Sequence, residues 1–349
     1  MLHEFIQNHS GIIHNIKSKI KQIDLNMLRF IKKNFDIDLY ESENNIIFNA
    51  ISYKNILLEP KRLKNDKISF VSHAHYDHMP EGGSGRVLTS EITWRFLRNT
   101  TILSPPDNDN IKILPAGHVP GASMLYIDED YRILYTGDFS RHQTPIFERA
   151  EPKKTDILFV DATYGAPEYV LPDRNEEKRA FLDTLNNLEK ANIVTYTYGK
   201  PQEIMVELIK RFGRGIEEDI YVSKSIFKKT LKIRDLMMKS DVDPFNFSKN
   251  PKRASIIITH SSSIFTNRPT ITVSGFLRTY SDFHFYISDH EDYEGLKRFI
   301  KECDPSLIIT LWGPPGTERF LGKDLEIPTL SFREFVVLLG LKMLSPSLF

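Results

Sequence analysis

The strongest constraint on this chain is a run of four metal-ligand side chains within six residues, His73-Ala-His75-Tyr-Asp77-His78. An apolar stretch at residues 68–71 comes just before it and predicts the end of a buried strand. Residues two apart in an extended backbone face the same side, so His73 and His75 can hold one cation together. If the chain then turns into a helix, Asp77 and His78 approach from another direction and can hold a second ion. This combination of residue type and spacing favours a two-metal site over a histidine-rich surface loop.

Two later segments offer further ligands of the same kind. His118 lies in a glycine-flanked turn at residues 114–123, and Asp138 follows an apolar strand expected at 131–136. Either residue alone would be ordinary turn chemistry. Their order after the first cluster favours a common site.

The order of these motifs resembles the metallo-β-lactamase superfamily. More narrowly, GHVPGASMLYI and ILYTGDFSR, which contain His118 and Asp138, are similar to the β-CASP nucleases. That branch includes the RNA 3′-end processing endonuclease, Artemis-type DNA repair nucleases and ligase-associated exonucleases. Three more segments match it: FVDATYG with Asp161, YTYGKPQEI at 196–204, and YISDHEDYEGLKRFI with His290. The resemblance covers about residues 55 to 320.

The resemblance implies a role for each matching residue. One ion is held by His73, His75 and His118, a second by Asp77 and His78, and Asp138 bridges the two. Mixed imidazole and carboxylate ligands suit zinc best, with manganese or iron as alternatives. Asp77, Asp161 and His290 are expected to carry catalysis, with His290 as the general acid that Asp161 orients and keeps charged.

Two positions depart from the family pattern. Glu59 replaces the aspartate that steadies the ligand loop, so we expect that loop to be held less rigidly. Trp312 stands where RNA-processing members have a histidine ligand, and an indole cannot coordinate a metal. We therefore expect one tightly bound zinc and a second, partial site that manganese or magnesium can also fill. DNA-repair members also lack this histidine, which favours DNA, whereas GHVPGAS and TGDFSR favour RNA, so both substrates stay open.

Alternating strands and helices predict an α/β fold. The resemblance implies a metallo-β-lactamase αββα sandwich with an inserted β-CASP-like α/β cap. We expect an amphipathic helical segment over 1–35, the lactamase-like domain over 36–165 and 285–349, and the cap over 166–284, including a helix over 225–239. The N-terminal helix either packs on the body or binds a protein partner, and a homodimer is a further open alternative.

Any nucleic acid must be bound by a local basic patch, because the chain as a whole has no excess of positive charge. Lysine plus arginine and aspartate plus glutamate both number 46, so no overall basic charge indicates such a partner. A basic run at 224–253 includes Lys224 and Lys228, which are candidates for phosphate contact or members of a solvated helix face. Ser123 and Ser288 are candidates for hydrogen bonds to phosphate, with turn capping as the alternative.

The number of cysteines and the hydropathy of the sequence limit the cellular compartments in which the protein is expected. The one cysteine, Cys303, excludes an internal disulfide and fits a reducing compartment. The sequence contains no apolar run of the roughly 18 residues that a membrane span needs, and no signal-peptide pattern. We expect a cytoplasmic protein without membrane contact.

These features together predict a metal-dependent nuclease that acts on DNA or RNA, preferentially as a 5′ to 3′ exonuclease. Metals alone would also suit a lactam or small-ester hydrolase, but such an enzyme needs neither the cap nor the Asp161–His290 pair. The main alternative is a β-CASP scaffold subunit of an RNA-processing complex with weak or no catalysis, an alternative that Trp312 keeps open.

Overall fold

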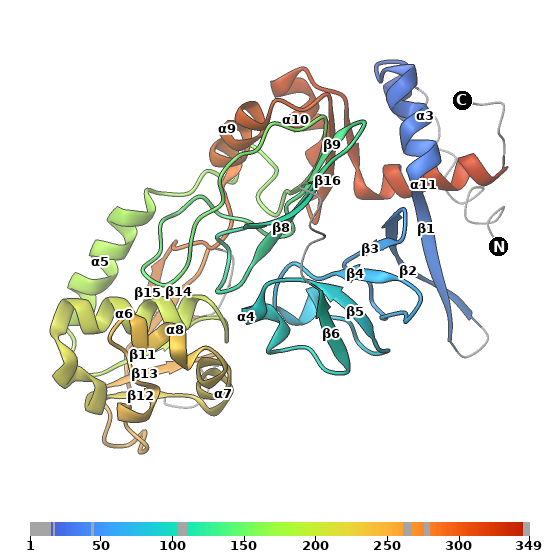
Figure 1. Cartoon of the computed structure of the whole chain (residues 1–349). Coiled ribbons are helices and arrows are strands. Elements are labelled where there is room, and N and C mark those ends of the chain that lie inside the picture. Colours follow the sequence, from blue (N-terminus) through green and yellow to red (C-terminus); the bar gives the residue numbers. More distant parts are fainter. Residues whose placement is uncertain are drawn as a thin grey trace.

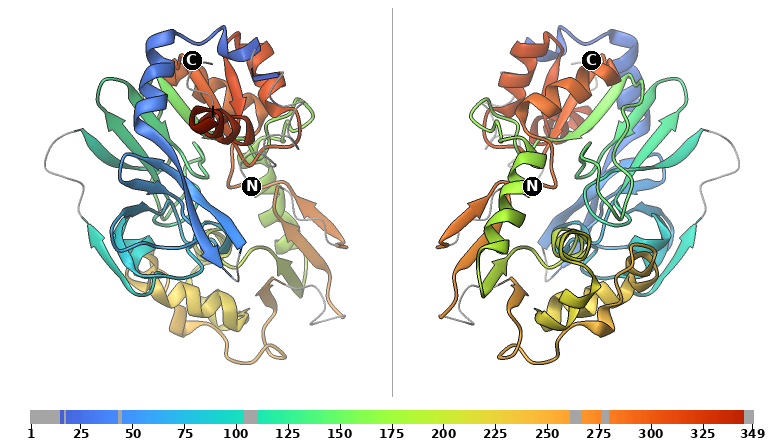
Figure 2. Two further views of the ribbon diagram at one scale, coloured as in Figure 1. Left: turned by 90° about the vertical axis from the view of Figure 1, so that its right-hand side faces the viewer. Right: turned by 90° about the vertical axis from the view of Figure 1, so that its left-hand side faces the viewer.

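Three sheets organise the computed structural model, which describes residues 15–16, 18–42, 45–103, 110–260, 267–275 and 280–344. Two of the sheets have six strands and one has five. Figure 1 shows the five-stranded sheet and its helices at the lower left, with α3 (Leu25–Asn34) and α11 (Phe332–Leu344) at the upper right, and both side views in Figure 2 keep this separation.

The first six-stranded sheet follows the chain order. Its strands are β1 (Phe35–Ser42), β2 (Asn45–Tyr53), β3 (Ile56–Leu58), β4 (Ile68–Phe70), β5 (Gly85–Leu88) and β6 (Thr100–Leu103). The first three are antiparallel and the rest run parallel from β3 to β6. The short helix α4 (Glu91–Trp94) connects β5 and β6.

The second six-stranded sheet has the order β17-β16-β10-β9-β8-β7. Its strands are β7 (Ile111–Pro115), β8 (Ser123–Asp128), β9 (Arg132–Tyr135), β10 (Ile157–Asp161), β16 (Leu307–Leu311) and β17 (Thr329–Ser331). All five residues of β10 are buried, because parallel neighbours flank it and both of its faces are covered.

The two faces of this second sheet serve different cores. Ile157 and Phe159 of β10 face the first sheet and the C-terminal helix α11 (Phe332–Leu344), where the Phe159 ring lies 5.7 Å from that of Phe35. Leu158 and Val160 face the opposite way. Helices α9 (Tyr293–Cys303) and α10 (Thr317–Leu325) complete that side.

The five-stranded sheet is wholly parallel, in the order β12-β13-β11-β14-β15. Its strands are β11 (Ala191–Val194), β12 (Ile220–Val222), β13 (Ile256–Thr259), β14 (Thr270–Val273) and β15 (Phe283–Phe285), and its helices are α5 (Arg174–Asn186), α6 (Lys200–Phe212), α7 (Lys224–Lys232) and α8 (Arg234–Lys239). This unit lies in sequence between β10 and α9. The expected α/β sandwich with an inserted cap is confirmed as a fold class, while the boundaries 36–165, 166–284 and 285–349 stay a prediction.

The helix expected over 225–239 is two helices. Ile233 leaves helical geometry at φ −121° and ψ 26°, and α8 begins at the next residue. The side chain of Ile233 is fully buried. We attribute the break to a β-branched residue that gives up ideal helix geometry in order to fill the core of the cap.

The N-terminal region packs on the C-terminal helix. Ile16 and Ile23 are buried with α11, and Lys19 Nζ lies 2.7 Å from Glu334 Oε2. Helix α3 (Leu25–Asn34) begins after Asp24, whose side chain accepts hydrogen bonds from two backbone amides. The amphipathic segment expected over 1–35 also includes the apolar residues Phe5, Ile12 and Ile13, which lie outside the described residues. No helix in the described ranges is long and apolar enough to cross a membrane.

Candidate metal centre and catalytic pair

The first ligand cluster follows β4 as an extended segment and ends in a single helical turn, η1 (Tyr76–His78). The His73 and His75 rings have centroids 4.8 Å apart, and the His78 ring lies 4.2 Å from that of His73. The expected change from extended chain to helix therefore brings the histidines together from two directions.

His118 and Asp138 reach the same place from the second sheet. His118 follows β7, and Asp138 follows β9 after Gly137 at φ +54°. A Cβ at Gly137 would lie 2.6 Å from Ser72 Cβ, so glycine allows the close approach of the two loops. Asp138 Oδ2 lies 3.6, 3.4 and 3.5 Å from Nε2 of His73, His78 and His118.

Hydrogen bonds fix which ring nitrogen of each histidine carries a lone pair. His118 Nδ1 and His75 Nε2 face the backbone carbonyls of Asp289 and Tyr198 at 2.8 and 3.3 Å. A carbonyl only accepts, so these two nitrogens donate and the lone pairs lie on His118 Nε2 and His75 Nδ1. Those two acceptor nitrogens are only 3.0 Å apart. Two lone pairs at this distance repel unless a cation lies beside both.

Two further buried atoms also lack a partner. Nε2 of His73 and Oδ1 of Asp138 make no hydrogen bond with any described residue, although buried polar groups are nearly always paired. Burial, reinforced by the neighbouring histidines, lowers the pKa of His73 and His118 well below the usual range. Both rings are therefore neutral, which is the form that binds metal.

The donor set therefore fits a divalent cation. The ligand atoms of His73, His75, His118 and Asp138 all lie within 4.8 Å of one another. Three imidazoles and one carboxylate are a combination that zinc favours. The sequence-derived ligand His78 lies outside this group of four, and its Nδ1 faces Glu59 Oε1 at 2.9 Å.

Glu59 holds in place the loop that carries His73 and His78. Its carboxylate, only 3% exposed, accepts hydrogen bonds from Ser72 Oγ, from His78 Nδ1 at 2.9 Å and from Tyr135 Oη at 2.7 Å. Because the Ser72 proton goes to Glu59, His73 Nδ1 donates to Ser72 Oγ at 2.8 Å and its Nε2 keeps the lone pair. Glu59 thus orients two histidines, against our expectation of a loosely held loop.

Asp77 lies apart from these groups. Its side chain is 79% exposed, and its Oδ2 lies 3.9 Å from His78 Nε2. It lines the same cavity as His78 and His118. Its position beside His78 keeps it within reach of a second ion, but the described residues give it no buried partner.

Asp161 and His290 form a hydrogen-bonded pair next to the metal cluster. Asp161 ends β10, and its Oδ2 accepts from His290 Nδ1 at 2.7 Å while Oδ1 accepts from the Thr163 amide and hydroxyl. The His290 ring lies 4.5 Å from that of His118. Burial alone lowers the pKa of His290, but the Asp161 carboxylate outweighs it and raises that pKa to about 9.

The four candidate substrate contacts have other roles or positions. Ser123 Oγ donates to the Gly121 carbonyl at 3.0 Å and closes a turn. Ser288 lines the cavity, but its hydroxyl donates to the His290 carbonyl and accepts from the His290 amide, which shapes the loop. Lys224 and Lys228 are exposed on α7 and do not line the cavity.

Sequence reasoning missed Lys229, which does line the cavity. Its Nζ donates to Thr197 Oγ1 at 2.6 Å. A helical projection would have found it, because Ile226 and Thr230 are buried on the inward side of α7.

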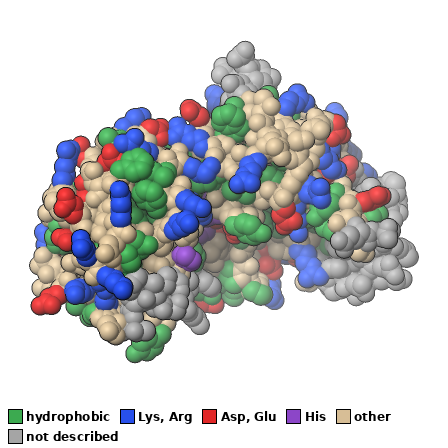
Figure 3. All heavy atoms as spheres, turned by 90° about the horizontal axis from the view of Figure 1, so that it is seen from below, with side chains coloured by type: hydrophobic (Ala, Val, Ile, Leu, Met, Phe, Trp, Pro, Cys, Tyr) green, Lys and Arg blue, Asp and Glu red, His purple; other side chains and the backbone are tan. Residues whose placement is uncertain are grey.

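The cavity over the histidines has a volume of about 430 Å³, within the range of roughly 300 to 1,000 Å³ usual for ligand sites. Figure 3 shows histidine side chains on this face of the molecule with lysine and arginine side chains beside them. The walls of the cavity come from the loops around the histidines and from the inserted cap. They include Tyr76, Tyr164, Tyr196, Lys229 and Trp312.

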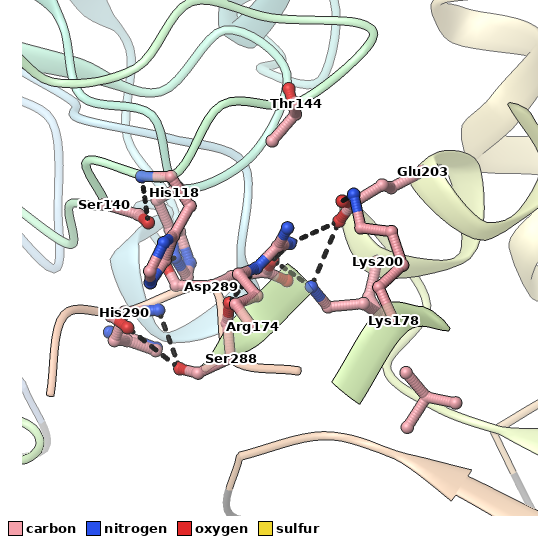
Figure 4. Close-up of polar contacts among 12 residues, drawn as sticks. His118, Ser140, Thr144, Arg174, Lys178, Lys200, Glu203, Ser288, Asp289 and His290 are labelled. Atoms are coloured by element: carbon pink, nitrogen blue, oxygen red, sulfur yellow. Dashed lines mark hydrogen bonds and ion pairs between the residues drawn. The ribbon is translucent and has the colours of Figure 1, made fainter. Parts of the chain in front are cut away.

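A buried ion cluster connects the cap helices to the His290 loop (Figure 4). Glu203 of α6 lies 2.6 Å from Arg174, 3.1 Å from Lys200 and 3.2 Å from Lys178. Lys200 also pairs with Asp289, and Arg174 Nε donates to the Ser288 carbonyl at 3.0 Å. The GKPQE part of the sequence motif therefore supports the loop that holds both His290 and the carbonyl partner of His118.

Comparison with known proteins gives partial matches. No protein-family model matches the chain. It is 23% identical over 281 residues to a probable DNA ligase of Opitutus terrae (71% of this chain, 27% of that protein) and 27% identical over 240 residues to an RNase J-like protein of Methanocaldococcus jannaschii (63% and 52%). It is 34% identical over 111 residues to cleavage and polyadenylation specificity factor subunit 3 of Dictyostelium discoideum (29% and 14%). The chain spans about half or less of the length of these relatives.

Proposed function

Because the chain belongs to the β-CASP branch of the metallo-β-lactamase superfamily, we propose that it is a metal-dependent nuclease that hydrolyses phosphodiester bonds of DNA or RNA as a 5′ to 3′ exonuclease. The observation that carries the proposal is the meeting of two groups in one cavity. Lone pairs of buried histidines converge beside Asp138, and the charged Asp161–His290 pair lies next to them.

In this proposal His73, His75 and His118 hold one ion, His78 and Asp77 contribute to a second, and Asp138 lies between them. Divalent ions bound there would activate the attacking water and offset the charge that builds on the phosphate oxygens. We propose zinc at the first position, and zinc, manganese or magnesium at the second.

His290 serves as the general acid. Hydrolysis of a phosphodiester leaves a sugar oxygen that needs a proton. Asp161 fixes His290 Nδ1 as a donor and keeps the ring protonated near pH 7, so Nε2 carries the proton that is transferred. Ser288 shapes the backbone on both sides of this ring and thereby fixes its direction.

Lys229 is proposed as the cation that meets the phosphate backbone in the cavity. The exposed Lys224 and Lys228 on the same helix would contact phosphates farther along the strand. The polar uses of Ser123 and Ser288 within the protein leave the substrate contact to the lysines. A cytoplasmic location is part of the proposal, since it rests on the single cysteine.

Incubation of the purified protein with end-labelled single-stranded DNA and RNA, with zinc, manganese or magnesium, tests this function. We expect stepwise shortening from the 5′ end by the unmodified protein and none by His118→Ala. Internal products would replace the exonuclease proposal by an endonuclease. Absence of cleavage under every metal, together with retained strand binding, would favour the scaffold alternative.

A further inference from the structure

We propose that Trp312 and Tyr76 form a binding subsite for an unpaired nucleobase in the histidine-lined cavity, with Lys229 contacting the adjoining phosphate. The inference rests on the proposed function, because it names the part of the strand that lies beside the metal centre. It assigns a binding role to the position where the RNA-processing members of the family have a ligand histidine.

Trp312 is held in an unusual way for a packing residue. It directly follows β16, has φ +56°, and is 50% exposed, although its neighbours in the strand are buried. A left-handed backbone is uncommon for a bulky side chain other than glycine and costs roughly 1 to 3 kcal/mol. A tryptophan that only filled the core would gain more from full burial.

The indole is also fixed in direction. The His78 ring meets it edge-on with centroids 5.2 Å apart, and Phe332 lies alongside at 6.3 Å with the two planes 27° apart. A flat side chain supported in this way and still half exposed offers a ready surface for stacking.

Two tyrosines extend this aromatic surface around the cavity. Tyr76 is 88% exposed on η1, one residue before Asp77, and Tyr196 is 47% exposed on the cap side. Bases stack on such side chains with little dependence on sequence, because every base has a π face. Exposed aromatic rings around a charged cavity are therefore the arrangement expected for a single strand.

Lys229 supplies the charge that a strand requires. Lys200 lines the same cavity but pairs with Asp289 and Glu203. Lys229 donates to the neutral hydroxyl of Thr197, and no carboxylate of the described residues forms an ion pair with it. Burial lowers the pKa of Lys229, and a phosphate beside it would reverse that shift.

This arrangement discriminates among nucleic acids. A base inside a duplex already has both faces covered by its neighbours, so its contact with Trp312 requires unstacking. A strand with an unpaired base next to the scissile phosphate meets no such cost. The subsite should therefore favour single strands and frayed ends, with little preference among bases.

Tryptophan fluorescence reports on the subsite without any need for cleavage. The chain has two tryptophans, Trp94 and Trp312, and Trp94 does not line the cavity. In a Trp94→Phe variant we expect oligothymidylate to quench Trp312, and an abasic strand of equal length to leave its emission nearly unchanged. The matched Trp312→Phe variant, which retains Trp94, should respond to neither strand. Equal quenching by both strands, or none while anisotropy shows binding, would overturn the proposal.

Binding measurements with variants complete the test. Trp312→Ala should weaken binding of the base-bearing strand about 5- to 150-fold, the range for loss of one base stack, and leave the abasic strand unaffected. Tyr76→Ala, at a position exposed enough to leave the fold intact, should weaken binding in the same selective manner. Lys229→Gln should weaken both strands, and Trp94→Ala neither. Equal effects of Trp312→Ala on both strands would remove the subsite.

The outcome for the subsite is separable from that for the proposed nuclease. Selective quenching of Trp312 in a protein that cleaves no strand would keep the subsite and remove the nuclease. Cleavage of base-bearing and abasic strands with the same KM would keep the nuclease and remove the subsite.

Discussion

Glu203→Ala is expected to destabilise the protein by about 3 to 5 kcal/mol, the usual cost of removing one partner from a buried ion pair. The Glu203 side chain is 3% exposed and is shared by Arg174, Lys200 and Lys178 at 2.6, 3.1 and 3.2 Å. Its removal leaves these cations with Asp289 and Glu207 as their remaining carboxylate partners. Lys200 is 2% exposed and cannot turn to water, so hydration does not replace its lost contact with Glu203.

Asp183→Ala provides a matched control. Asp183 on α5 pairs with Arg211 on α6 at 3.1 Å, so it connects the same two helices, but the two side chains are 67% and 50% exposed. An exposed pair of this kind contributes about 0 to 1 kcal/mol. Both variants remove one carboxylate between the same helices. They differ in burial and in the number of cation partners, which is three for Glu203 and one for Asp183.

Urea unfolding followed by circular dichroism measures both effects. Burial raises the pKa of Glu203, but Lys200 and Arg174 outweigh it and hold that pKa well below its ordinary value of 4.5. A carboxyl with a lowered folded-state pKa stabilises fully above its unfolded pKa, and this contribution is lost as pH falls towards the folded value. The difference between wild type and Glu203→Ala should therefore be constant near pH 7 and shrink below about pH 4. Equal destabilisation by Glu203→Ala and Asp183→Ala at pH 7 would refute the reasoning.

Three further predictions concern the site. His290→Ala should slow cleavage by about 10²- to 10⁴-fold with metal content unchanged, and metal loss in this variant would make His290 a ligand instead. Glu59→Gln should lower metal affinity by about 10- to 100-fold, because an amide cannot accept hydrogen bonds from all three donors. Chelator competition measures this affinity, and an unchanged value would show that the ligand loop keeps its conformation without the Glu59 carboxylate. Trp312→His should raise occupancy of the second site in elemental analysis, while an unmodified protein with two tightly held metals would show that another residue already completes that site.

The closeness of the histidines follows from local geometry. The spacing of His73, His75 and His78 predicts that their side chains lie together, and the structure places their rings side by side. That these residues hold metal stays a prediction. The division of α7 from α8 at Ile233 was not predictable, since the charged pattern continues across it and only the core of the cap decides the break. Lys229 is a different case, because a helical projection of α7 places it beside the buried Ile226 and Thr230, but the sequence does not show that this side of α7 faces the cavity.

Contacts between distant segments were beyond sequence reasoning. Lys200 and Asp289 are 89 residues apart in the chain, and neither the KPQE nor the SDH segment indicates that the other lies beside it. The role of Glu59 was misjudged for a similar reason. A longer carboxylate reads as a looser anchor, yet its backbone at φ +47° places it where Ser72, His78 and Tyr135 all reach it.

The central claim is that buried histidines and Asp138 hold metal on which strand cleavage depends. The direct test adds zinc stepwise to metal-free protein and measures bound metal and cleavage of an end-labelled strand in the same samples. We predict no cleavage without metal, tight binding of the first ion, and a rate that rises as the second, weaker site fills. Cleavage at full rate by protein without bound metal would contradict the account.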